Sequence, residues 1–298
     1  MTSALREAQA RHFDAHVPFT PVSRTLRASG FRYPYILKDE LIARAISQVS
    51  PAAGQRVLDL GCGRGILLDR LAASFRTQGY GVDVSRGTLK GLRSESVASH
   101  RIACSEGENL PFRDSTFELA VSMDVLEHVE APERVLAEVV RVLKPGGVVL
   151  CYAVSRNNRF TFNWFLIRAL EALGVDHWAW NGHAADRLVD PVQTSASLEQ
   201  MGCRVHYLRP FHSFFTILFD QSILVLYWLA SRFHLAERQN SAGDMQPNRM
   251  LKAISAASKF LLGHLDRLDR PWVSRGLSNG FLIAATKLQT SAMIGRPT

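Results

Sequence analysis

The sequence predicts an α/β protein built on a doubly wound, largely parallel β-sheet. Three observations indicate this class. Short apolar runs alternate with amphipathic segments, a glycine-rich turn follows the first of these runs, and 47% of the 298 residues are hydrophobic. Strands and helices that alternate at this spacing are typical of a parallel sheet covered by helices. A chain of this size buries a full core, so we expect one large domain or one domain with an elaboration.

The elements are expected in a regular order. A helix over residues 37–49 leads into the sheet, because its apolar residues recur at helical spacing. Apolar runs then predict strands at 56–60, 79–83, 101–105, 117–122, 147–154, 203–208 and 280–287. Amphipathic segments predict helices near 64–75, 86–97 and 132–143. A further helix is expected to begin at a capping residue, Thr194 or Ser195, and to end at Gly202.

The segment between the last two predicted strands is too long and too apolar for a turn. Residues 214–233 are intensely apolar, and residues 249–270 are amphipathic and basic. Asp220 would be costly in the middle of a bilayer, so we do not expect a transmembrane helix. Basic amphipathic segments favour anionic lipid surfaces. We therefore expect an interfacial lid, and the alternative is a helical cap that packs over the active site.

The distribution of charge supports the same region as an interaction surface. Residues 1–203 hold 23 basic against 22 acidic side chains, whereas residues 204–298 hold 12 against 5. The basic residues are interleaved with apolar runs, and no nucleic-acid module is recognisable, so no nucleic-acid partner is expected. The four widely spaced cysteines and the polar N-terminus predict a cytoplasmic protein, peripheral at most on the inner face of a membrane. The oligomeric state is left open.

The stretch "DLGCGRG" after the first predicted strand indicates a ligand site. Gly61, Gly63 and Gly65 let a ligand approach the main chain closely, but their spacing differs from that of dinucleotide sites. Asp59 before the loop would repel a phosphate and could hold a cationic amine. Asp83 closes the second strand, where a carboxylate can accept both ribose hydroxyls. These residues predict a site for a nucleoside that carries a positive group.

Two further motifs follow in order, "CSEGENLPFRDSTFELAVSMDVLEHV" and "RVLKPGG". With them, residues 38–155 resemble the class I S-adenosylmethionine-dependent methyltransferases. The resemblance implies a Rossmann-like seven-stranded sheet with an antiparallel last strand and S-adenosyl-L-methionine as cofactor, and the apolar and basic segment would form a hydrophobic helical insertion before that strand. We therefore expect four segments: an N-terminal segment (1–37) that helps close the site, a cofactor-binding core (38–210), a helical lid (211–275), and the last strand and tail (276–298).

The same resemblance assigns roles to individual residues. Asp59, Gly61 and Gly63 would line the methionine end of the cofactor, Asp83 would hold the ribose, and Glu106 with Gly107 would lie beside the adenine. Glu118 stands where the family usually has aspartate in "FD". The complete set expected to bind the cofactor is Asp59, Gly61, Cys62, Gly63, Gly65, Asp83, Val84, Glu106, Gly107 and Met123.

The run "SMDVLEHV" offers candidates for catalysis. Transfer of a methyl group from a sulfonium needs a base only if the acceptor loses a proton, and His128 is the candidate. If the run begins a helix, Asp124, Glu127 and His128 share one face and could hold a divalent cation. Ubiquinone-biosynthesis O-methyltransferases, to which the run is similar, have a bound metal there. The alternative is a set of hydrogen-bonding residues, and no metal is assigned.

The expected function is methyl transfer to a small hydrophobic acceptor, lipid-like or aromatic, at an oxygen atom. His177, Trp178, Trp180 and His183 are candidates to line its pocket, or else they anchor a packed loop. Two alternatives stay open. The acceptor could be a soluble natural product or sugar, or the protein could be a membrane-docked module that binds the cofactor without turnover.

Overall fold

A computed structural model describes residues 36–95, 100–174, 187–222, 237–239, 245–247 and 260–289 of the chain. The segment expected to help close the site (1–37) lies almost entirely outside these residues. So do the four residues suggested for the acceptor pocket, His177, Trp178, Trp180 and His183.

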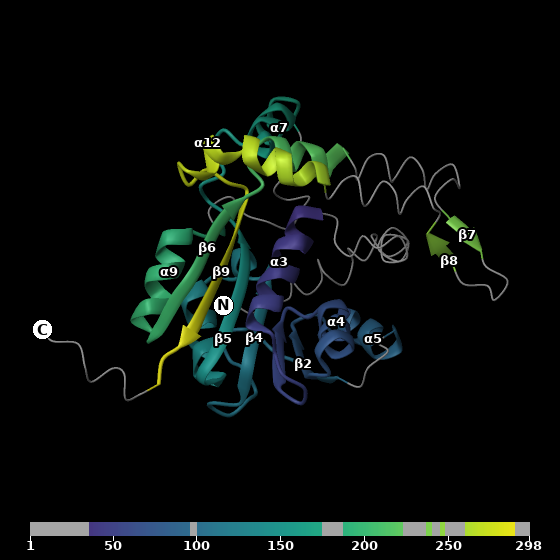
Figure 1. Ribbon diagram of the computed structural model, residues 1–298. Coiled ribbons are helices and arrows are strands. Elements are labelled where there is room, and N and C mark those ends of the chain that lie inside the picture. Colours follow the sequence, from purple (N-terminus) through teal and green to yellow (C-terminus); the bar gives the residue numbers. More distant parts are fainter. Residues whose placement is uncertain are drawn as a thin grey trace, which may run out of the picture.

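The centre of the molecule is a seven-stranded sheet in the order β3-β2-β1-β4-β5-β9-β6 (Figure 1). Its strands are β1 (Arg56–Leu60), β2 (Gln78–Asp83), β3 (Arg101–Cys104), β4 (Phe117–Met123), β5 (Leu143–Val154), β6 (Cys203–Phe211) and β9 (Gly280–Lys287). The strands from β3 to β5 pair in parallel, and β9 lies antiparallel between β5 and β6. The predicted fold class is therefore confirmed, including the antiparallel last strand.

Helices cover both faces of the sheet (Figure 1). On one face lie α3 (Ile36–Val49), α4 (Ile66–Phe75) and α5 (Arg86–Glu95), and on the other lie α6 (Pro132–Val142) and α9 (Pro191–Gln200). Each face has its own apolar core, because the central strands bury side chains on both sides. This burial explains why the strands are apolar throughout.

Two element starts and one whole helix differ most from the predictions. The N-cap of α9 is Asp190, whose side chain accepts hydrogen bonds from the amides of Val192 and Gln193, so the predicted cap at Thr194 or Ser195 was wrong. The strand β5 begins at Leu143 and includes "KPGG", with a register shift against β4. The helix α7 (Phe162–Ala172) was not predicted at all; Thr161 caps it by accepting from the Trp164 amide.

A layer of helices lies beyond the carboxyl ends of the parallel strands (Figure 1). It consists of residues 159–173, which include α7, residues 214–222, and residues 260–273, which include α12 (Arg270–Val273), and we call it the helical layer. Most of it belongs to the segment between β6 and β9, which also contains the short hairpin β7 (Glu237–Gln239) and β8 (Met245–Pro247). Among the described helices, none is both long enough and apolar enough for a membrane span.

Buried Asp269 holds the helical layer together. Its carboxylate accepts hydrogen bonds from the amides of Phe214, Phe215 and Thr216 and from the Thr216 hydroxyl, which caps the helix over residues 215–222. Trp272 stacks on Phe214 with ring centroids 5.7 Å apart. The first and last described parts of the insertion therefore pack as one unit above the sheet.

Candidate functional site

The loop between β1 and α4 has the backbone geometry that only glycine adopts without strain. Gly61, Gly63 and Gly65 have φ values of 73°, 50° and 72°, and Gly65 is the N-cap of α4. The amides of Gly61 and Cys62 donate to the Val82 carbonyl at 2.8 and 3.0 Å, which fixes the loop to the end of β2. The loop therefore turns tightly at the carboxyl edge of the sheet.

Close packing excludes side chains from two positions around this loop. A Cβ at Gly61 would lie 2.4 Å from Cγ2 of Val125, the residue two positions after β4. A Cβ at Gly81 on β2 would lie 2.6 Å from Sγ of Cys62. The Cys62 side chain is thus packed inside the protein, and what this residue can offer a ligand is its main chain.

Asp83 joins the loop to the end of β2. Its Oδ2 accepts from the Gly63 amide at 3.0 Å, and its Oδ1 accepts from the Ser85 amide at 2.8 Å. The N-cap of α5 is Ser85, whose Oγ accepts from the Thr88 amide at 3.0 Å. Asp83 is therefore not needed as the cap, and it presents a carboxylate directly beside the glycine loop.

Asp59 lies at the same edge with its side chain buried. Burial raises its pKa to about 8, and the nearby Asp83 carboxylate adds to the rise. A buried carboxyl group of this kind ionises readily only when a positive charge lies beside it. The two acidic side chains at this edge suit a nucleoside that carries a cation.

The other residues expected around the cofactor occupy two places. Val84, Glu106 and Gly107 follow the ends of β2 and β3, and a Cβ at Gly107 would lie 3.2 Å from Val135. Met123 is the last residue of β4 and is buried. Glu118, in contrast, lies at the opposite edge, where it accepts from the Arg56 amide at 2.8 Å and pairs with Lys144. It therefore ties strands together and takes no part in the site.

The run after β4 does not form the helix face that a metal site would need. Asp124 precedes a single 3-10 turn over Leu126–His128 and has a left-handed φ of 57°. Glu127 is fully buried, and one of its oxygens accepts from the Val154 amide at 3.4 Å. Burial, followed by the charge of Asp124, raises the pKa of Glu127. His128 is half-buried at the end of the turn.

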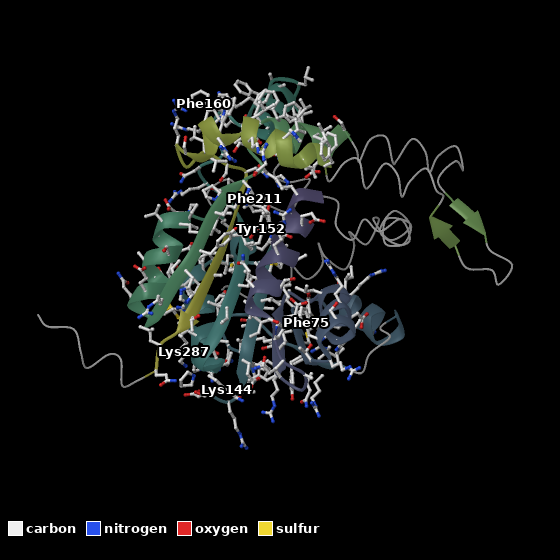
Figure 2. The ribbon with its side chains drawn as sticks, viewed as in Figure 1. Phe75, Lys144, Tyr152, Phe160, Phe211 and Lys287 are labelled. Carbon is white, nitrogen blue, oxygen red and sulfur yellow. The ribbon has the colours of Figure 1, made fainter. Side chains whose placement is uncertain are left out.

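Lys38 of α3 is a site residue that the sequence reasoning missed. Its ammonium pairs with Asp124 and lies 3.8 Å from the centroid of the Tyr152 ring, at the carboxyl end of β5 (Figure 2). The side chain is only 3% exposed. Asp124 lies 86 positions away in the chain, so no local motif could have indicated the pair.

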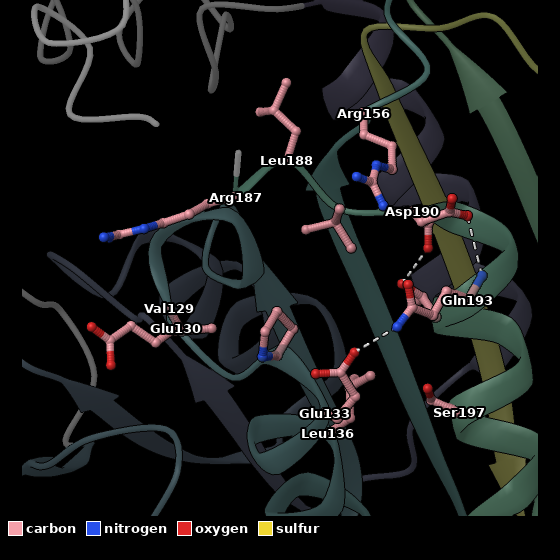
Figure 3. Close-up of a pocket in the computed structure, with 13 residues that line it drawn as sticks. Val129, Glu130, Glu133, Leu136, Arg156, Arg187, Leu188, Asp190, Gln193 and Ser197 are labelled. Atoms are coloured by element: carbon pink, nitrogen blue, oxygen red, sulfur yellow. Dashed lines mark hydrogen bonds between the residues drawn. The ribbon is translucent and has the colours of Figure 1, made fainter. Parts of the chain in front are cut away.

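A cavity of about 230 Å³ opens on the α6 and α9 side of this edge (Figure 3). Its walls come from the residues after the 3-10 turn, the segment after β5 and the start of α9, and include Glu130, Arg156 and Arg187. Gln193 donates to Glu133 across its base at 3.0 Å. The cavity is polar and adjoins the end of β5.

Taken together, the fold and the loop are those expected of an α/β protein with a site for a cationic nucleoside at the carboxyl edge of its sheet. Comparisons with known proteins agree. The family described as a methyltransferase domain matches residues 58–151. The ubiquinone biosynthesis O-methyltransferase of Rhodopseudomonas palustris (strain HaA2) is 30% identical over 256 residues, which cover 83% of this chain and 89% of that protein.

Two solved structures share the fold. The phosphoethanolamine N-methyltransferase 2 of Haemonchus contortus in complex with S-adenosyl-L-methionine has a TM-score of 0.52 at 19% identity, over 90% of this chain and 59% of that one. The [4+2]-cyclase SpnF also has a TM-score of 0.52, at 20% identity over 84% and 80%. At these identities the likeness shows the fold alone.

The chain belongs to the class I S-adenosylmethionine-dependent methyltransferases. It is an enzyme of that class, and its cofactor is S-adenosyl-L-methionine. The cofactor carries a sulfonium, an ammonium and a carboxylate, so its net charge is positive, and the structure places two acidic side chains, Asp59 and Asp83, around the glycine loop.

Proposed function

We propose that the enzyme transfers a methyl group to an oxygen atom of a small hydrophobic acceptor, lipid-like or aromatic, at the surface of an anionic membrane. The observation that carries the proposal is the helical layer, which lies over the carboxyl edge where the cofactor binds and exposes large apolar side chains to solvent. The similarity to ubiquinone biosynthesis O-methyltransferases supports an oxygen acceptor on a hydrophobic molecule.

The exposed side chains of the helical layer are of the kinds that enter a membrane interface. Leu173 is 78% exposed and Phe260 is 75% exposed, and Phe160, Phe165 and Leu268 are about half exposed. Figure 2 shows Phe160 at the outer end of the molecule, away from the sheet. Aromatic residues sit favourably where water meets the acyl chains.

The charges of the helical layer complement an anionic surface. Arg159, Arg267 and Arg270 are exposed, and none of them has an acidic partner within the described parts of the chain. The acids of the layer already have partners: Asp266 binds Arg209, Asp220 binds His212, Glu171 binds Arg168, and Asp269 caps a helix. Cations beside a phospholipid surface each add about 1 kcal/mol of attraction.

The chemistry follows from the residues of the edge. The bound cofactor supplies an electrophilic methyl group on a sulfonium. The glycine loop and Asp83 hold the nucleoside, and Asp59 balances its positive charge. The acceptor oxygen forms a bond to the methyl carbon as the bond from carbon to sulfur breaks, and we propose that His128 accepts the hydroxyl proton. The rest of the catalysis is orientation and exclusion of water.

The first test is methyl transfer itself. Purified enzyme, methyl-labelled S-adenosylmethionine and a host-cell extract divided into lipid and aqueous fractions are combined, and the label is located by mass spectrometry. Asp83→Ala is the cofactor-deficient control. Label in the lipid fraction supports the proposal. Label only in the aqueous fraction would show a soluble acceptor, and cofactor binding with no label, when the acceptor is known to be present, would show a binding module.

The second test is membrane binding. Vesicles of phosphatidylcholine with and without phosphatidylglycerol are sedimented with the wild-type protein and with the variants Leu173→Glu, Phe260→Glu and Val192→Glu. Val192 is 69% exposed on α9, outside the helical layer, and is the matched control. We expect binding only to the anionic vesicles, loss of binding in the two helical-layer variants, and no loss in Val192→Glu. Equal loss in all three variants would contradict the assignment of the surface.

A further inference from the structure

The metal site implied by the similarity to ubiquinone-biosynthesis O-methyltransferases does not fit the residues of this chain. Oδ2 of Asp124 binds the Lys38 ammonium, and the Glu127 carboxyl group is buried beneath the edge. Within the described ranges, no three acidic, histidine or cysteine side chains gather closely enough to hold a metal ion. The Lys38 ammonium on Oδ2 repels a divalent cation from this carboxylate because the two charges have the same sign.

Lys38 is fixed where it lies. Leu37, Leu41 and Ile42 of the same helix are buried against the sheet, and the Lys38 side chain between them is 3% exposed. A buried ammonium needs a partner, and Asp124 supplies the opposite charge while the Tyr152 ring offers its electron-rich face. The Lys38 ammonium is therefore held in one place at the carboxyl edge of the sheet.

Asp124 contacts the Lys38 ammonium and is also partly exposed at the end of β4, so it can contact the cation and a ligand at the same time. It follows the last residue of β4, its amide donates to the Tyr152 carbonyl at 3.2 Å, and its left-handed φ directs the chain away from the strand. The side chain is 41% exposed. Within the part of the chain that the structure describes, Oδ2 binds Lys38 and Oδ1 accepts no hydrogen bond.

We propose that Lys38 is a positioning residue that takes the place of a divalent cation beside Asp124 and Glu127. Its ammonium holds Oδ2, so that Oδ1 of Asp124 accepts a hydrogen bond from a hydroxyl group of the acceptor, beyond the end of β4, other than the hydroxyl that is methylated. This inference rests on the proposed function, because it requires an acceptor with a hydroxyl group. It makes methyl transfer by this chain independent of added metal.

The test begins with a measurement that needs no acceptor. Binding of Mn²⁺ is followed by electron paramagnetic resonance for the wild type, Lys38→Met, Asp124→Asn and the double variant, with cofactor affinity measured by calorimetry on the same samples. We expect no Asp124-dependent Mn²⁺ site in the wild type. Lys38→Met and the double variant should also gain no Asp124-dependent site, because too few ligands gather at this edge among the described residues. Cofactor affinity should stay unchanged in all four proteins.

An Asp124-dependent Mn²⁺ site in the wild type would overturn the proposal, and so would a folded Lys38→Met that methylates the labelled acceptor fraction as fast as the wild type does. Lys38→Gln replaces Lys38→Met if the latter does not fold. With the labelled acceptor fraction, chelation should leave wild-type turnover unchanged, while Asp124→Asn should lose about tenfold to a hundredfold in kcat/KM, the effect of one charge-assisted hydrogen bond. Because the Mn²⁺ and cofactor measurements use no acceptor, failure of the proposed function and failure of this inference are distinguishable.

Discussion

Replacing Gly61 by alanine should damage both stability and cofactor binding, and Gly54 provides the matched control. Both residues have left-handed φ values, 73° and 81°. A side chain at either position costs about 1–2 kcal/mol of backbone strain. At Gly54 a Cβ meets nothing within 4 Å, whereas at Gly61 it lies 2.4 Å from Val125, which adds about 1–3 kcal/mol of overpacking. We therefore expect losses of about 1–2 kcal/mol for Gly54→Ala and about 2–5 kcal/mol for Gly61→Ala.

Thermal unfolding and calorimetry check these values. Each kcal/mol lowers the Tm of a chain of this size by about 2–4 °C, so the two variants should separate clearly. Cofactor affinity should fall only in Gly61→Ala, because Gly54 precedes β1 at the opposite edge of the sheet. The reasoning is refuted if both variants lower the Tm equally, or if Gly61→Ala binds the cofactor as the wild type does.

Three further predictions concern buried charges. Burial raises the pKa of Asp59 from 3.8 to about 8, so its carboxyl group costs no stability below about pH 4 and costs more as the pH rises toward 8. The Tm of Asp59→Asn should therefore exceed that of the wild type by an amount that grows from about pH 4 to about pH 8, and cofactor binding should be lost. A Tm difference that stays constant with pH would contradict this prediction. Asp269→Ala should lower the free energy of unfolding by about 2–4 kcal/mol, because three amides lose a charged acceptor. Limited proteolysis should then cleave the helical layer first. An unchanged digest would show that the cap is dispensable. Lys287 donates to three carbonyls at the end of α6. Lys287→Met should therefore lower the free energy of unfolding, measured by urea titration, by about 1–2 kcal/mol without changing cofactor affinity. A loss of cofactor affinity would contradict a purely structural role.

The individual strands could be predicted from the sequence because each is a short apolar run, whereas the number of strands and the antiparallel last strand were predicted from the family resemblance. Parallel strands buried on both faces are continuous apolar runs, and each ends at a turn residue that the pattern reveals. The glycine loop could also be predicted from the sequence, because its residues are seven consecutive positions and its partner carboxylate, Asp83, stands at the end of the next strand.

The features that were missed depend on distant or unusual packing. The helix α7 escaped prediction because it buries only Ile167 fully and exposes Phe165 and Leu166, so it lacks the apolar periodicity of a surface helix. The pair between Lys38 and Asp124 exists only because α3 packs across the ends of β4 and β5. The misplaced cap of α9 arose because Asp190 and Pro191 form the true start, four residues before Thr194.

The register of β6 and β9 has a consequence for how this enzyme diversifies. Phe211, the last residue of β6, pairs with Gly280, the first residue of β9, so the long intervening segment leaves and re-enters the sheet at adjacent points. Lengthening a segment whose ends are already joined adds little free energy, about 0.6 kcal/mol for each doubling. The whole segment can therefore be exchanged as a cassette, and grafting it between related enzymes should transfer acceptor preference while the cofactor edge stays intact.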